Sequence, residues 1–142
     1  MRLLLSKISE NLQIKLLHCD MFPYKRSNII DLGLGESNVL NVAYGISMFE
    51  PVFVYGVCGF LLHRLEQLKL NLRFAKYPVL LFNAGGSNHP CYSEFGEGHT
   101  CNEDIEIAKI LKVPVYTPSY EDFNTTVLEL LQTEGLKIIR LT

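Results

Sequence analysis

The sequence has 142 residues, is 48% hydrophobic, and carries 13 basic and 15 acidic side chains, for a formal net charge of −2. A chain of this length buries roughly two-thirds of its unfolded surface, so residues 1–142 are expected to form one domain with its own core. The charges are interspersed, no basic run follows a phosphate backbone, and no apolar stretch reaches the roughly 20 residues of a membrane span. These features exclude nucleic acid and membrane as expected partners and favour a cytoplasmic protein.

Short apolar runs alternate along the chain with segments whose apolar residues repeat at helical spacing. In chain order, the predicted elements are a strand at 14–18, a strand at 29–31, a helix at 36–49, a strand at 52–55, a helix at 60–76, a strand at 79–82, a helix at 102–111, a strand at 113–116, a helix capped by Ser119, and a strand at 136–141. A long loop, 83–98, follows the strand at 79–82. The alternation predicts an α/β fold, a three-layer, doubly wound, mostly parallel sheet with helices on both faces.

Glu36 is the most informative single residue, because it stands at a strand-to-helix junction. The apolar pair Ile29–Ile30 comes first, a turn with Gly33 and Gly35 follows, and Glu36 then begins the predicted helix. In parallel sheets, ligand sites lie at the carboxyl ends of strands, and the first turn of a helix favours an anion. Two interpretations stay open from these residues alone, an ordinary helix-start acid and a functional carboxylate.

Several common enzyme motifs are missing or incomplete. One Gly-x-Gly pair lacks the third glycine of a dinucleotide fingerprint, and neither a phosphate-binding P-loop nor Gly-x-Ser-x-Gly occurs. The four cysteines form no C-x-x-C pair, so no metal site built from sequence neighbours is predicted. Cys19 and Cys58 are interpreted as reduced core thiols, whereas Cys91 and Cys101 flank His99 and leave a disulfide or a metal site open there.

Three segments, taken in order, resemble one known family. Residues 31–38 (DLGLGESN) are similar to the family pattern D-x-G-I-x-E-Q/H, residues 53–61 (FVYGVCGFL) to F-V-Y-T-F-x-x-F-L, and residues 96–104 (GEGHTCNED) to G-P-T-H-x-x-x-E-D. The resemblance is to the pyrimidine-binding domain of transketolase-type thiamine diphosphate enzymes, including the deoxyxylulose-phosphate synthase domain. It runs from about Leu17 to the C-terminus, and it implies the thiamine diphosphate-binding fold.

The resemblance implies roles for residues of the first two segments. The matching glutamate, Glu36, would be the catalytic residue and would hydrogen-bond the N1′ atom of the aminopyrimidine ring of thiamine diphosphate. Phe60 matches an aromatic residue that packs on this ring, and the competing interpretation is an ordinary core residue. Val57 replaces the first aromatic of the family's pocket, so we expect looser packing there, or completion of the pocket by another side chain such as Tyr55.

The third segment implies residues that bind substrate. His99 matches a histidine that reaches the sugar substrate, and its competing interpretation is an exposed loop residue. His89 lies in the same loop as a further candidate, although a solvated histidine is the alternative. Phe95 stands where transketolases carry an aspartate that binds substrate hydroxyls. This departure argues against ordinary sugar phosphates and leaves a ketose-like or 2-keto substrate.

The sequence lacks the Gly-Asp-Gly motif with which the family's diphosphate-binding domain holds magnesium. The resemblance therefore implies one subunit of a split transferase that moves a two-carbon ketol or acyl unit, is inactive alone, and shares thiamine diphosphate with a separate diphosphate-binding subunit that carries the magnesium. Apolar helix faces without partners imply self-association. Two other hypotheses stay open, a non-catalytic binding or assembly module that has kept the fold, and a fragment of a longer enzyme.

Overall fold

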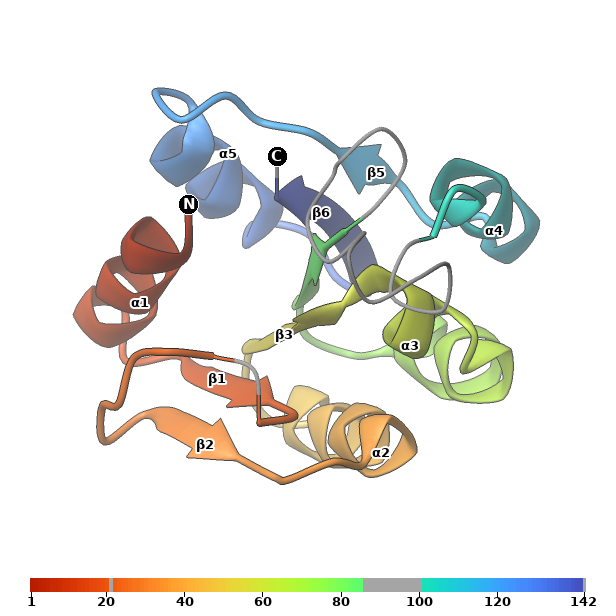
Figure 1. Ribbon diagram of the computed structural model, residues 1–142, viewed down its shortest axis with the longest axis horizontal. Coiled ribbons are helices and arrows are strands. Elements are labelled where there is room, and N and C mark those ends of the chain that lie inside the picture. The colour runs from red at the N-terminus through yellow and green to blue at the C-terminus, as the bar shows by residue number, and fades with distance from the viewer. Residues whose placement is uncertain (21, 86–100, 142) are drawn as a thin grey trace.

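The computed structural model describes residues 1–20, 22–85 and 101–141. Six strands form one sheet in the order β2-β1-β3-β4-β6-β5, and every neighbouring pair in it is parallel (Figure 1). The strands are β1 (Lys15–His18), β2 (Ile29–Asp31), β3 (Val52–Val57), β4 (Val79–Ala84), β5 (Val115–Tyr116) and β6 (Leu136–Leu141). The helices are α1 (Arg2–Asn11), α2 (Glu36–Ser47), α3 (Cys58–Leu62), the π-helical η1 (Gln67–Asn71), the 3-10 turn η2 (Leu72–Phe74), α4 (Asp104–Leu111) and α5 (Phe123–Leu130).

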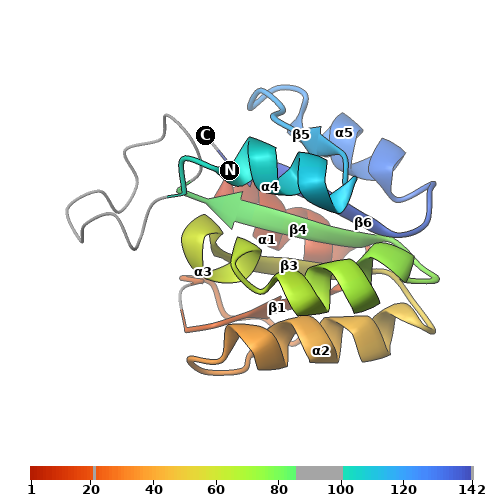
Figure 2. The same cartoon turned by 90° about the vertical axis from the view of Figure 1, so that its right-hand side faces the viewer.

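Helices cover both faces of the sheet, as Figure 1 shows along the strands and Figure 2 from the side of α2, α3 and α4. On one face, Leu5 of α1 and Phe123 of α5 share a buried cluster with Phe53 of β3 and Phe82 of β4. On the other face, α2, α3, η1 and α4 pack against the alternate side chains of the same strands. Every residue of β3 and β4 is buried, which is typical of parallel strands covered on both sides. The predicted three-layer, doubly wound α/β fold is therefore confirmed.

The six predicted strands are present, and so are the helices predicted at 36–49 and 102–111, with small differences at their ends. The last predicted helix begins later than expected. The Ser119 hydroxyl accepts a hydrogen bond from the backbone N–H of Asp122 at 3.1 Å, and Asp122 is the residue that precedes α5. Ser119 therefore closes the turn before the helix, and the prediction that it caps the helix itself is wrong.

The single helix predicted at 60–76 is also wrong, because the segment is divided into three pieces. α3 begins two residues earlier and ends at Leu62, and the chain then bends at His63 before it continues as η1 and η2. Leu62 before the bend and Leu68 and Leu72 after it all lie fully buried in the same core cluster. The segments before and after the bend thus both pack into that core.

The N-terminal helix α1 lies before the first element predicted from the sequence, the strand at 14–18. Leu5 and Ile8 of α1 are buried three positions apart, a spacing that places both on one helix face. The segment packs against α5 and completes the cover of its face of the sheet. No helix among the described residues has both the length and the apolar composition that a membrane crossing requires.

Candidate functional site

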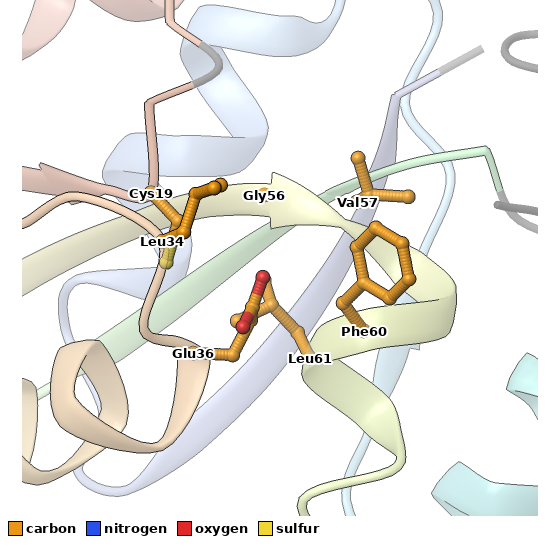
Figure 3. Close-up of a pocket in the computed structure, with 7 residues that line it drawn as sticks. All are labelled: Cys19, Leu34, Glu36, Gly56, Val57, Phe60 and Leu61. Atoms are coloured by element: carbon orange, nitrogen blue, oxygen red, sulfur yellow. The ribbon is translucent and has the colours of Figure 1, made fainter. Parts of the chain in front are cut away.

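A cavity of about 130 Å³ lies at the carboxyl edge of the sheet, where α2 and α3 begin (Figure 3). Its walls come from the segment after β1, the turn after β2, the end of β3 and the first turn of α3. The lining residues are Cys19, Leu34, Glu36, Gly56, Val57, Phe60 and Leu61. Three segments far apart in sequence thus meet at the place where parallel sheets bind ligands.

The turn after β2 places Glu36 at the cavity. One carboxylate oxygen of Asp31 accepts hydrogen bonds from the backbone N–H groups of Gly33 and Asp20, each at 2.9 Å. These bonds, that from Gly33 first, hold the pKa of the Asp31 carboxyl below its usual range. Gly33 has a φ of +68°, which glycine adopts without the steric cost that a side chain brings. Gly35 then precedes α2, whose first residue is Glu36, so the Glu36 carboxylate stands at the positive end of the helix dipole.

The opposite wall depends on a close approach between Gly56 and Leu61. A Cβ atom added to Gly56 would lie 2.7 Å from a terminal methyl carbon of Leu61, too close for two carbon atoms. α3 begins directly after β3, so Phe60 and Leu61 reach the cavity without an intervening loop. The absence of a side chain at Gly56 is therefore what lets the first turn of α3 pack against the end of β3.

The cavity combines one acidic group with mostly apolar walls. Figure 3 shows the Glu36 carboxylate directed into the space between Leu34, Gly56 and Leu61, with the Phe60 ring beside Val57. Glu36 and Phe60 are half-buried, and Val57 and Leu61 are buried. A carboxyl group in such surroundings can share a proton with a nitrogen atom of a flat heteroaromatic ring, while the apolar side chains contact the faces and edge of that ring.

The sequence-predicted residues Glu36, Val57 and Phe60 are thus brought together around one cavity, but Tyr55 is not. Side chains alternate along β3, and Tyr55 lies on the face covered by α1 and α5. Its ring packs edge-on against Phe22, with 4.9 Å between centroids. The expectation that Tyr55 completes the pocket is therefore wrong, because the alternation of the strand turns it to the other side of the sheet.

The predicted substrate residues His89 and His99 lie outside the described residues, as does Phe95. Their assignment to substrate binding remains a prediction. Asp104, from the end of the third motif, is described. It is buried at the start of α4, where one of its carboxylate oxygens lies 2.7 Å from Nε of Arg140 in β6.

Cys19 is a lining residue that sequence reasoning assigned only to the core. It is 4% exposed and belongs to the buried cluster, as expected, but it also faces the cavity. Burial raises the pKa of its thiol, and the negative charge of Glu36 raises this pKa further, so Cys19 is a neutral group beside the carboxylate. Its position directly after the strand at 15–18 was the available signal, because that position marks the carboxyl edge of the sheet.

No family model and no curated protein matches the sequence. Among solved structures, the chain is similar to one described as "Split gene transketolase, inactive beta4 tetramer", with a TM-score of 0.72 and 20% sequence identity. The match covers 97% of this chain and 47% of the other, so this chain spans about half of that length. At this identity the match concerns the fold. The chain therefore has the α/β fold of a split-gene transketolase chain, and the resemblance to transketolase-type enzymes is confirmed at that level.

Proposed function

We propose that this chain is the pyrimidine-binding subunit of a split, transketolase-like, thiamine diphosphate-dependent transferase of the cytoplasm. The observation that carries the proposal is the Glu36 carboxylate, which enters a mostly apolar cavity at the carboxyl edge of the sheet. The fold similarity to a split-gene transketolase supports the same assignment. The reaction is transfer of a two-carbon ketol or acyl unit from a ketose-like or 2-keto donor.

The residues around the cavity fit an aminopyrimidine ring. Glu36 holds a proton at the N1′ atom of that ring and so promotes the tautomer that the reaction needs, a task suited to a positioned carboxyl group. Phe60 and Val57 contact the ring and keep water from it. The bound cofactor supplies the stabilisation of a carbanion at the carbon atom that is transferred. His99 and, as a further candidate, His89 contact the substrate.

A second chain completes the site in this proposal. Anchoring a diphosphate takes a metal ion or a dense set of donors, and the sequence lacks the Gly-Asp-Gly motif that serves this purpose in the family. The partner is therefore a separate diphosphate-binding subunit that carries magnesium, and the chain is inactive alone.

Self-association is also part of the proposal. The structural neighbour is described as a tetramer. In this chain, large apolar side chains are exposed on the outside of the α2 and α3 layer, among them Phe49 at 80%, Leu70 at 62% and Phe74 at 67%. A surface of this kind is stabilised when a partner covers it.

The test is reconstitution from two purified chains. We expect the full chain, mixed with a Gly-Asp-Gly-containing subunit encoded beside its gene, to bind thiamine diphosphate in the presence of Mg²⁺, as measured by calorimetry, while neither chain binds it alone. Glu36→Gln should weaken this binding and reduce turnover by a factor of about 10²–10⁴. Glu106→Gln, on the exposed side of α4, is the matched control and should change neither.

Two results would contradict the proposal. If the mixture binds no more cofactor than the separate chains, the chain does not provide half of such a site. If the mixture binds cofactor and turns over substrate but the Glu36→Gln variant has the same turnover rate as the unchanged chain, the proposed role of the carboxylate is wrong.

A non-catalytic assembly module is the second candidate. Val57 stands where the family has an aromatic residue, so Phe60 is the one aromatic side chain among the described residues that line the cavity. The structural neighbour is itself described as inactive. For such a module, the two chains would form a stable complex, and neither cofactor binding nor an effect of Glu36→Gln would be measured.

A further inference from the structure

A second group of polar side chains lies on the far side of α3 from the cavity. His63 directly follows α3, and Cys101 and Glu103 lie in the turn that leads into α4, which packs beside α3 (Figure 2). One ligand atom from each of these three residues lies within 4.8 Å of the ligand atoms of the other two. Imidazole nitrogen, thiolate sulfur and carboxylate oxygen are the three ligand types that zinc takes in proteins.

The three ligand atoms need to move only a short distance toward one another to hold an ion. Zinc bonds of about 2.0–2.3 Å in a tetrahedral site place ligand atoms roughly 3.3–3.8 Å apart, about 1–1.5 Å less than the 4.8 Å within which these atoms lie. Cys101 is fully buried, and its backbone N–H donates a 3.1 Å hydrogen bond to the carbonyl of Gly85, so the main chain that carries the sulfur is anchored. His63 and Glu103 are exposed, and their side chains are able to rotate toward that sulfur.

We propose that His63, Cys101 and Glu103 bind a divalent zinc-type ion that links the end of α3 to the start of α4. The charges balance, because the thiolate of Cys101 and the carboxylate of Glu103 together neutralise a 2+ ion while the imidazole stays neutral. Formation of the metal–sulfur bond displaces the Cys101 thiol proton to solvent. Three protein ligands leave the fourth tetrahedral position for water or another ligand.

Cys58 is a supporting residue of this site. It is fully buried at the start of α3, and a hydrogen bond joins its side chain to that of Cys101. It does not belong to the group of three ligand atoms. A hydrogen bond to a ligand atom fixes the orientation of that ligand, and loss of such a bond typically weakens metal binding by about 10–100-fold.

The experiment is a titration of the reduced, metal-free full chain with Co²⁺, which reports thiolate ligation by a sulfur-to-cobalt charge-transfer band, followed by displacement with Zn²⁺. We expect one ion per chain. His63→Asn, Cys101→Ser and Glu103→Gln should each weaken binding by more than the 10–100-fold expected of Cys58→Ser. Zn²⁺ should also raise the thermal midpoint of the unchanged chain but not that of His63→Asn.

Glu106→Gln and Cys19→Ser are the matched controls, since neither residue belongs to the group of three ligands. Both variants should keep full affinity. His63 and Glu103 are exposed, so their variants keep the test decisive even if Cys101→Ser fails to fold. The proposal is overturned if no charge-transfer band appears, if His63→Asn and Glu103→Gln bind as tightly as the unchanged chain, or if Cys58 and Cys101 of the purified chain are joined in a disulfide.

Discussion

Gly56 offers a sharp test of how the cavity is built, through the substitution Gly56→Ala. The new Cβ atom would lie 2.7 Å from one terminal methyl carbon of Leu61 and 3.1 Å from its Cγ atom. Leu61 is fully buried, so its side chain must move to make room, and the cavity that it lines is the open space beside it. The substitution should therefore destabilise the fold and also reduce the cavity.

The magnitude follows from two opposing contributions. Adding a carbon atom to a packed core costs about 1–3 kcal/mol, and replacing glycine by alanine within regular structure returns about 0.5–1 kcal/mol. We expect a net loss of about 0.5–2 kcal/mol in the free energy of unfolding. Leu61→Ala alone should cost about 2–5 kcal/mol, because it removes a fully buried leucine.

Urea unfolding of the two single variants and the double variant tests this account. In Gly56→Ala/Leu61→Ala the crowding is gone, so the double variant should be more stable than the sum of the single effects predicts, by at least about 0.5 kcal/mol. The slope of the free energy of unfolding against urea concentration should be the same in all variants, since the surface exposed on unfolding does not change. Strictly additive effects, or a Gly56→Ala variant as stable as the unchanged chain, would refute the close approach of these two residues.

Two further predictions concern ionisable groups. Burial lowers the pKa of His18 below 6.5, so the folded chain favours the neutral imidazole. The corresponding contribution to the free energy of unfolding is complete above pH 6.5 and is lost as the pH falls toward the pKa of the folded state. His18→Gln should therefore flatten the loss of stability between pH 8 and pH 5 in urea titrations, and an unchanged pH dependence would contradict this. Arg140→Met breaks the buried pair with Asp104 and should cost about 3–5 kcal/mol, whereas Arg26→Met, whose pair with Glu10 is about half exposed, should cost less than about 1 kcal/mol. Equal losses in thermal unfolding would show that burial of the first pair has no effect.

The sequence was sufficient for the sheet because central parallel strands are continuous apolar runs. β3 and β4 are buried on both faces, so each is a continuous apolar run that can be recognised in the sequence without knowing which elements pack against it. The bend at His63 has no such signal, since the apolar residues on both sides of it keep nearly helical spacing in the sequence. The helix at 2–11 has a signal in the sequence, the spacing of Leu5 and Ile8, which places both residues on one helix face.

The sequence predicts some residues of the candidate site and not others. The position of Glu36 just beyond a strand, at the edge where a parallel sheet binds ligands, indicates this residue from the sequence alone, whereas the role of Phe60 is implied by the family resemblance of residues 53–61. Tyr55 was misplaced because proximity in sequence does not tell which face of the strand a side chain occupies. The group of His63, Cys101 and Glu103 was not predicted as a unit, since its members come from segments that only the packing of α3 beside α4 brings together.

The proton exchange rate at thiazolium C2 of thiamine diphosphate tests the central claim most directly. It is measured by NMR in D₂O on the mixed complex of this chain and the diphosphate-binding subunit, at saturating cofactor and Mg²⁺. If Glu36 holds the proton at N1′, the unchanged complex should exchange this proton faster than free cofactor, and Glu36→Gln should slow the exchange by about 10²–10⁴-fold. The same exchange rate in the Glu36→Gln complex as in the unchanged complex would contradict the proposed role of Glu36.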